Sequence, residues 1–523
     1  MENSRVVTTR GFSLSRWLLV LPIAVVSLFV LFPVATIVIE FARLENIWEA
    51  LTSTSLQKVW WFSTWQALLS TIATLIVGLP ATWALSRFRF RGDQLISGLL
   101  TVPFLMPAVI VATGIRSVIP NGGITAILWA HVAFNVAVVL RVVGPRWALL
   151  DQNQIDTAAD LGARPFQIAT SVVWPHIKSA VLSAASLVFV FCFTSFAIVT
   201  ILGGVRRRTI DGEIFIQAIR LGDTRTATAL ALLQAVVIIL VVLTTSRYRQ
   251  QELMTLTSTT APRVRMRRAI LASTYLPTVV VIAPLALLLV RSFVINGEFS
   301  FDGYTWLFDG TTSAVGIDAV AILRTSLVFA FFCISLAVPL ALIISTSLST
   351  TTREEEKNSA WWPRFTALLT TAPMVLSSVT MGLGLIVAFD EWPVDWRSEQ
   401  WLIPVIHAVI ALPLATYVLI PAAQAIPGDL RHAAASLGAS PLRSWIQVDL
   451  RLLMPAIRRA SGLCAAVSIG EFGATSFLSR SGSTTIPVAI SQLINRPGDV
   501  LPQTALALAT ITVAICAVLL SPR

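Results

Sequence analysis

Few residues in this chain combine a reactive side chain with a position where it could act. Glu471 lies inside an apolar stretch, where an ionisable group is costly and usually faces a cavity or a partner. Its near match earlier in the chain is Ser195, which follows Thr194. These three residues are candidates for contact with a solute, and Glu471 could stabilise a cation. The alternative for each is a structural hydrogen bond to a neighbouring helix.

The sequence lacks the patterns expected of an enzyme. No G-x-x-x-x-G-K-[ST] occurs, so the chain has no P-loop to hold the phosphates of ATP. The apolar stretches carry no paired carboxylates, histidine clusters or nucleophile-and-base spacing. The cysteines are scattered within apolar stretches without a C-x-x-C, which indicates buried packing rather than metal or disulfide roles. We therefore expect no catalytic residue, no metal site and no resident cofactor.

A short polar segment occurs twice, each time between apolar stretches. It reads DTAADLGARPFQIATSVVWP from position 156 and HAAASLGASPLRSWIQVDLR from position 432, an offset of 276. We expect Asn153 and Asp429 to be N-caps of a helix in the two copies, and Asp156 to favour the positive end of the first helix. Small residues then give each helix a smooth face: Ala158, Ala159, Ala434 and Ala435.

A glycine and a proline follow in both copies. Gly162 and Gly438 are predicted to end the first helix in the left-handed conformation. Pro165 and Pro441 are placed to start a second short helix, with Ser440 as its N-cap in the second copy. The pattern predicts helix, tight turn, helix. A rigid projection of this kind could transmit the movement of a partner, whereas a flexible loop would absorb it.

The elements that must position these residues are apolar helices. The chain has 523 residues, of which 55% are hydrophobic and only 12% charged, too few charges for a soluble surface. Long apolar stretches recur at lengths that could cross about 30 Å of hydrocarbon. We expect an all-α membrane protein with about twelve transmembrane helices: 17–40, 64–86, 96–115, 124–143, 178–204, 227–246, 269–292, 324–347, 362–388, 402–420, 455–478 and 502–520.

The two halves of the chain correspond beyond the polar segment. The offset of 276 also relates His131 to His407, which predicts a shared packing role, and TALAL at 228–232 to TALAL at 504–508. Self-similarity on this scale indicates two tandem copies of one domain. We expect a first domain at 1–246, a polar linker at 247–268 and a second domain at 269–523. Six spans in each copy give both copies the same orientation, which creates a pathway along their pseudo-twofold axis.

Arginines set the expected orientation. Most of the clusters that make the net charge +11 fall on one side of a twelve-span arrangement, so the positive-inside rule places both termini in the cytoplasm. This distribution suits a bilayer rather than nucleic acid. Arg206, Arg207 and Arg208 fall on the opposite side. They could hold acidic residues of a docking protein, attract an anionic substrate or form a solvated turn.

The repeated segment resembles the coupling-loop signature E-A-A-x-x-x-G-x(9)-I-x-L-P of ABC importer permeases. The first copy supplies Asp156, Thr157, Ala158 and Gly162, and the second supplies His432, Ala433, Ala434 and Gly438. The resemblance implies two type I permease domains of six helices each, fused in one chain. It also implies coupling loops at about 153–175 and 429–451.

The same resemblance implies partners. Two copies of a P-loop ATPase would bind ATP and Mg²⁺ and dock on the two loops, and an extracytoplasmic binding protein would deliver the substrate. The expected location is a bacterial-type cytoplasmic membrane. SIGEFGATSF (468–477) and ILGG (201–204) resemble thiamine-type permeases, with ferric iron and phosphonates as alternatives. An ion-coupled secondary transporter is the rival class, but it would need several intramembrane charges.

Overall fold

The computed structural model describes residues 18–41, 44–204, 207–249, 268–312, 316–349, 373, 376–390, 399–480 and 482–520. This part of the chain is a bundle of helices with one two-stranded hairpin, β1 (Val294–Ile295) and β2 (Glu298–Phe299). The predicted all-α membrane class is confirmed. The linker 247–268 lies mostly outside the described residues.

The helices of the first half run from the N-terminus to α14. Their bounds are α2 (Val20–Val26), α3 (Phe32–Phe41), α4 (Leu44–Thr52), α5 (Thr54–Arg87), α6 (Asp93–Leu105), α7 (Ala108–Arg116), α8 (Ile124–Ala148), α9 (Gln152–Asp160), α10 (Pro165–Ile168), α11 (Trp174–Phe193), α12 (Ala197–Leu202), α13 (Ile210–Phe215) and α14 (Thr224–Arg249). Three π-helical turns join neighbouring helices: η1 (Ser27–Leu31), η2 (Ala169–Val173) and η3 (Ile216–Arg220).

The second half repeats this order. Its bounds are α15 (Arg268–Arg291), α16 (Asp302–Phe308), α17 (Ala319–Ser349), α20 (Ser378–Ala388), α21 (Leu402–Gln424), α22 (Gly428–Ser436), α23 (Pro441–Ser444), η6 (Trp445–Asp449), α24 (Leu450–Gly470), α25 (Gly473–Leu478), α26 (Ile486–Ile494) and α27 (Val500–Leu520).

Ten helices among the described residues are long and apolar enough to cross a membrane. The pair α6 and α7, bent by 97°, makes an eleventh candidate. The predicted stretch 362–388 lies mostly outside the described residues, and α20 is its end. The observed spans therefore fit the expected number of about twelve.

Besides the bent stretch 96–115, two predicted spans contain a break and have the wrong boundaries. The stretches 178–204 and 455–478 are not single helices, because the chain breaks after α11 at Thr194 and after α24 at Glu471 before continuing as short helices. Both breaks are enclosed by protein, where irregular backbone is tolerated at membrane depth. Hydropathy does not detect such a break. The spanning helices instead begin earlier, at Pro165 and Pro441.

The internal repeat is visible in specific contacts. In the first half the hydroxyl of Ser63 accepts a hydrogen bond from the Ile210 amide at 3.0 Å. In the second half Ser326 accepts one from the Ile486 amide, also at 3.0 Å. Each contact ties a long helix, α5 or α17, to the start of a short one, α13 or α26, so the two halves share one internal architecture.

The first helix of each half packs against the other half. Gly114 of α7 lies directly against the Pro284 carbonyl of α15, so that a side chain would collide with it. The equivalent Gly384 of α20 faces Pro33 of α3, whose Cβ would lie 3.0 Å from an added Cβ. Small residues permit such close helix approach in membranes. The two halves are therefore interlocked by an exchange of their first spans.

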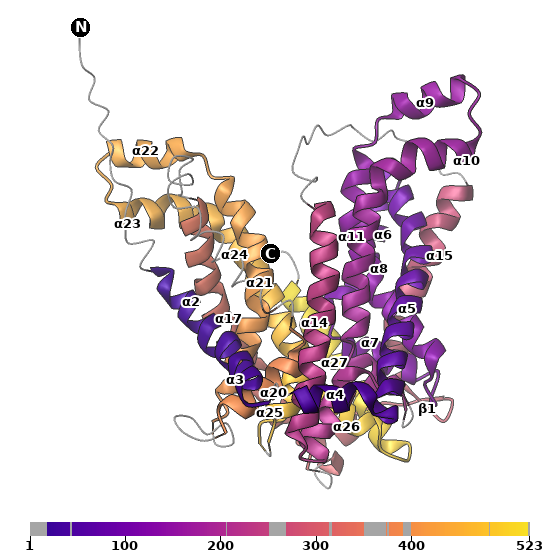
Figure 1. Cartoon of the computed structure of the whole chain (residues 1–523), viewed down its shortest axis with the longest axis vertical. Coiled ribbons are helices and arrows are strands. Elements are labelled where there is room, and N and C mark those ends of the chain that lie inside the picture. The colour runs from indigo at the N-terminus through magenta and orange to yellow at the C-terminus, as the bar shows by residue number, and fades with distance from the viewer. Residues whose placement is uncertain are drawn as a thin grey trace.

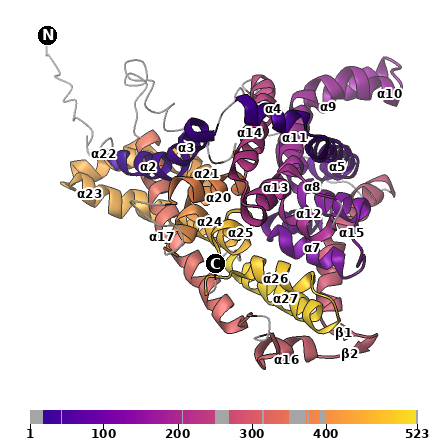
Figure 2. The same cartoon turned by 60° about the horizontal axis from the view of Figure 1, so that its bottom comes forward.

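The bundle is open at one end and joined at the other. Figure 1 shows α9 with α10 and α22 with α23 at opposite upper corners, while the helices of the two halves meet at the bottom. We call the end with α9, α10, α22 and α23 the projection end, and the end where the two halves meet the far end. Figure 2 turns the far end forward and shows the short helices α13, α20 and α25 gathered there. Contacts between α13 and α20 and between α7 and α26 join the halves in this region.

Candidate functional site

The first projection consists of α9, a glycine turn and α10. Its N-cap is Asp151, whose carboxylate accepts the Asn153 amide at 3.0 Å, so the prediction of Asn153 as N-cap is wrong. Asp156 lies in the second turn rather than at the positive end, and it accepts a hydrogen bond from the Gln152 side chain at 2.8 Å. Ala158 is half-buried and Ala159 exposed, and none of α9 is fully buried.

The second projection consists of α22, a glycine turn and α23. Its helix follows Pro427 without a side-chain cap, so the prediction of Asp429 as N-cap is also wrong. Asp429 instead lies in the first turn, where its charge favours the helix dipole. Ser440 does cap α23 as predicted, accepting the Arg443 amide at 3.3 Å. Ala434 is half-buried and Ala435 exposed, as in the first copy.

The glycine turns are equivalent in both projections. Gly162 has φ of 83° and Gly438 has φ of 80°, which confirms the left-handed prediction. Each turn closes with the two hydrogen bonds of a Schellman motif. In the second projection the Ala439 amide donates to the Ala434 carbonyl at 3.0 Å, and the Gly438 amide donates to the Ala435 carbonyl at 2.9 Å. Such a turn fixes the direction in which the chain leaves the helix.

The second helix of each projection continues directly into a membrane span. Pro165 and Pro441 start helices that run to Phe193 and Gly470, 29 and 30 residues long. The prediction that a helix starts at each proline is therefore right, but the prediction that this helix is short is wrong. We call these two long helices the rods. In both rods a π-helical turn, η2 or η6, lies at the same point, between the projection and the membrane span. Each rod extends about 43–45 Å at 1.5 Å per residue, from the projection to the far end.

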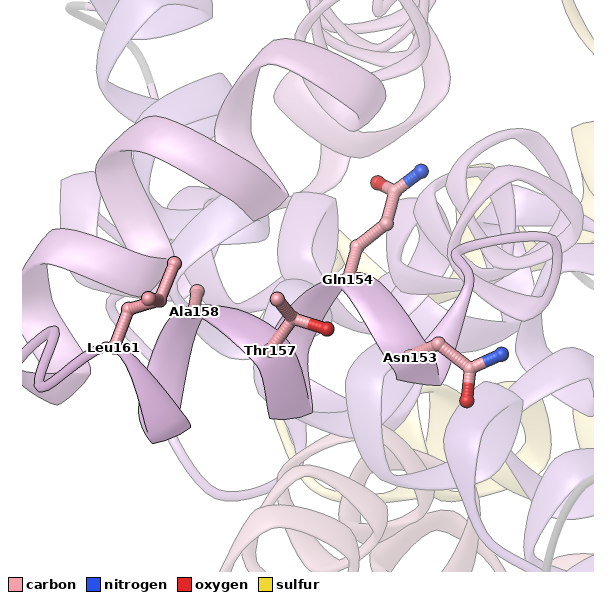
Figure 3. Close-up of a pocket in the computed structure, with 5 residues that line it drawn as sticks. All are labelled: Asn153, Gln154, Thr157, Ala158 and Leu161. Atoms are coloured by element: carbon pink, nitrogen blue, oxygen red, sulfur yellow. The ribbon is translucent and has the colours of Figure 1, made fainter.

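The tips of the projections are apolar and exposed. The large hydrophobic side chains with the highest exposure in the described chain are Leu437, at 88%, and its equivalent Leu161, at 83%. Phe166 and its equivalent Leu442 are exposed beside them. Figure 3 shows a shallow groove along α9, lined by Asn153, Gln154, Thr157, Ala158 and Leu161. Sequence analysis missed these apolar residues, although two exposed leucines at equivalent positions are typical of a docking surface.

The second projection has a brace that the first lacks. Arg431 of α22 contacts Asp449 at the end of η6, with its Nε 2.8 Å and a terminal nitrogen 2.6 Å from Oδ1. Asp449 is buried. The equivalent residues in the first half, Ile155 and Val173, are apolar. There Arg87 at the end of α5 instead contacts Gln152 and the Leu150 carbonyl. Each projection is thus fixed to its rod or to a neighbouring span.

Glu471 caps a short helix in the structure. Its carboxylate accepts the amides of Ala474 at 3.0 Å and Thr475 at 2.9 Å, and the Thr475 hydroxyl at 2.5 Å. His407 lies 3.6 Å away and is hydrogen-bonded to the same hydroxyl at 2.8 Å. Both carboxylate oxygens are therefore engaged by the start of α25, which supports the structural alternative for Glu471.

The first half has a related histidine network. His131 is hydrogen-bonded to Ser195 at 2.9 Å and to Ser70 at 2.8 Å. In the second half His407 bonds Ser468 at 2.9 Å, and Cys333 stands where the first half has Ser70. Thr194 bonds only back to its own helix, at the Val190 carbonyl, among the contacts described. The two histidines thus share a packing role, as predicted, and Ser195 contributes to it.

Part of the arginine cluster after α12 can be placed. Arg206 lies outside the described residues, while Arg207 and Arg208 are exposed. Arg208 is 3.5 Å from the Glu213 carboxylate on α13. The helix α13 that Arg208 contacts lies at the far end, apart from the projections.

Comparison with known proteins agrees with this geometry. Residues 75–255 match the family described as "Binding-protein-dependent transport system inner membrane component". The thiamine transport system permease protein of Haemophilus influenzae is 24% identical over 91% of this chain and 90% of its own length. A protein of Sinorhizobium fredii named as an ABC transporter permease is 22% identical over 86% and 84%. The chain is thus similar to transport-system permeases over both of its halves.

Other similar proteins match either most of the chain or a part of it. The thiamine transport system permease protein of Brucella abortus is 24% identical over 89% of this chain and 87% of its own. A protein of Salmonella typhimurium named as a 2-aminoethylphosphonate transport system permease is 34% identical, but over 143 residues, 27% of this chain and 54% of its own. Full-length similarity therefore extends over both halves.

An aromatic contact that the sequence did not reveal lies where the rods end. Phe196 follows the end of the first rod and Phe472 follows the end of the second, at equivalent positions. Their rings stack on one another with centroids 5.1 Å apart and planes 21° apart. Residues related by a twofold axis can contact each other only on that axis. The two halves therefore contact each other through equivalent residues at the far end, next to the ends of both rods.

Proposed function

We propose that the permease forms the translocation pathway of an importer and is driven by two ATPase subunits that dock on its two projections. ATP and Mg²⁺ would be bound by those subunits. The exposed leucine pair at equivalent tips supports docking on two like partners, since the same surface is presented twice. The predicted coupling residues would act by shape: Ala158, Ala159, Ala434 and Ala435 as a smooth face, and Gly162, Gly438, Pro165 and Pro441 as fixed turns.

The rods supply a route for the force. If the ATPase subunits move together on closing around ATP, the projections approach each other. Each rod is a continuous helix whose other end adjoins Phe196 or Phe472, so approach at one end would rock the halves and part the aromatic stack at the other. Alternating access in repeat transporters works by such rigid movements.

We infer the orientation from arginines in the described residues. Arg89 and Arg91 lie just after α5, at the projection end, and Arg431 and Arg443 lie on the second projection. Positive charge concentrates on the cytoplasmic side of membrane proteins. In this proposed orientation the projections would lie in the cytoplasm and the far end outside. A solute-binding protein would dock there, and Arg207 and Arg208 could meet its acidic residues.

Thiamine is the substrate we propose. The observation that carries this proposal is the similarity to permeases named for thiamine transport over about nine-tenths of both chains. The cargo would be a cation, and the bilayer-spanning part would mainly provide its path, with selection by the binding protein.

Uptake measurements test the substrate. Deletion of the gene for this chain should abolish high-affinity uptake of radiolabelled thiamine by the source cells, and expression of the intact chain should restore it. The control is uptake of a solute carried by another system, which should not change. Unchanged thiamine uptake in the deletion strain would reject thiamine.

A phosphonate is the second candidate, because the local identity of 34% to the 2-aminoethylphosphonate permease exceeds that to any thiamine relative compared above. The same deletion strain should then lose uptake of 2-aminoethylphosphonate and keep that of thiamine. The two labelled solutes, measured in parallel, separate the candidates.

A further inference from the structure

The far end contains a polar contact between the two halves. The hydroxyl of Ser377, at the break before α20, donates a hydrogen bond of 2.8 Å to the carboxylate of Asp211 on α13. Ser377 also caps α20, accepting the Thr380 amide at 3.0 Å. Asp211 is only 1% exposed and Ser377 only 7%. The hydrogen bond is therefore buried and joins one half directly to the other.

The internal repeat has no equivalent of this contact at the counterpart positions. The counterpart of Asp211 in the second half is Pro487, at the offset of 276, and the counterpart of Ser377 in the first half is Pro107, at the offset of 270. Both pairs lie at the same contact, α13 with α20 on one side of the axis and α26 with α7 on the other. Prolines thus stand at both counterpart positions, while the contact of α13 with α20 buries a carboxylate.

A buried carboxylate is costly unless it is fully hydrogen-bonded. The second carboxylate oxygen of Asp211 is buried beside the Gln234 side chain, without a well-formed hydrogen bond to it among the described residues. The side-chain amide nitrogen and oxygen of Gln234 are likewise buried without a well-formed hydrogen bond among the described residues. A contact that is half satisfied when closed, and fully hydrated when open, is suited to being released. A permanent structural contact would be expected to satisfy both oxygens.

We propose that the Asp211–Ser377 hydrogen bond is a latch that holds the two halves together at the far end and is broken when this end opens. The latch rests on the proposed rocking of the halves. It lies on one side of the axis only, so opening requires the release of one polar contact beside the aromatic stack. Asp211 and Ser377 position the two halves relative to each other at the far end, and neither residue contacts the projections.

The test measures how often the far end opens in the purified, full-length permease in lipid nanodiscs. The four native cysteines, all buried, are replaced by alanine, and Val379→Cys on α20 serves as the reporter because Val379 is fully buried. The rate of reaction with a maleimide reports opening. No ATPase, binding protein or substrate is needed, so the result is independent of the docking and thiamine proposals.

Asp211→Ala and Ser377→Ala should each speed labelling about tenfold, the effect of losing one hydrogen bond to a charged group. The double variant should be no faster than the faster single variant, because both remove the same contact. Asp211→Asn retains an acceptor for Ser377 and should label more slowly than Asp211→Ala. Thr416→Ala is the matched control, since the buried Thr416 hydroxyl bonds only within α21, to the Pro413 carbonyl at 2.8 Å.

Unchanged labelling in both single alanine variants would overturn the latch. So would equal labelling of Asp211→Asn and Asp211→Ala, which would mean that the charge matters and the hydrogen bond does not. Melting temperatures of all variants identify any that fail to fold. Ser377→Ala remains informative if Asp211→Ala is lost, because the equivalent position in the first half is a proline without a hydroxyl.

Discussion

At the scale of single residues, the acidic side chain that first suggested a substrate site has a structural explanation. Both oxygens of Glu471 are held by the first turn of α25. A carboxylate inside a span was correctly expected to have a partner, since burial without one is too costly. Which partner it has depends on the break after α24, and hydropathy did not reveal that break.

We predict that Glu471→Ala lowers the stability of the permease, because the amides of Ala474 and Thr475 lose their acceptor. The loss should be about 1–3 kcal/mol and should appear as a lower melting temperature of the purified chain. Glu471→Gln should lose less, as one oxygen acceptor remains. Neither variant should raise the KM for uptake selectively.

Ser195→Ala is the matched control, since Ser195 is the equivalent residue and its hydroxyl engages His131 alone in the described contacts. Its melting temperature should fall less than that of Glu471→Ala. An increased KM in Glu471→Gln with an unchanged melting temperature would instead show that the carboxylate contacts the substrate.

At the scale of elements, the two projections were the most predictable part of the molecule. Glycine in the left-handed conformation and proline at the start of a helix are local requirements, so Gly162, Gly438, Pro165 and Pro441 were read correctly. The N-caps were not, because the residue at which α9 or α22 begins depends on where the preceding span ends. That end is set by packing with other helices.

We predict that Gly438→Val impairs coupling. Valine at a φ of 80° is strained by about 1–2 kcal/mol, enough to disturb the turn and reduce substrate-dependent ATP hydrolysis by the assembled transporter about fivefold or more. Gly162→Val should act similarly. The measurement is the ATPase rate of the complex in proteoliposomes with substrate and binding protein.

Gly428→Val is the matched control in the same projection. Gly428 lies at the start of α22, has no positive φ and has no atoms within 4 Å of an added Cβ. Its ATPase rate should match the parent. Equal rates for Gly438→Val and Gly428→Val would argue against a mechanical role for the turn.

At the scale of the whole molecule, the sequence predicted the repeat but not the packing of the first helix of each half against the other half. The offset of 276 predicted two like-oriented halves, whereas the exchange of α3 and α15 between them depends on contacts between residues far apart in sequence, such as Gly114 and Pro284. The same holds for the stack of Phe196 on Phe472, which exists only because the two halves meet on their axis.

The account depends on the paired projections being the attachment points of the motor subunits. A photoreactive amino acid at Leu161 or Leu437 in the assembled transporter tests this directly, with Ile39 as control because it is an equally exposed apolar residue, at 82%, on the spanning helix α3. We predict cross-links to the ATPase subunit from both projections and none from Ile39. Absence of ATPase cross-links from Leu161 and Leu437, in a complex that hydrolyses ATP, would contradict the account.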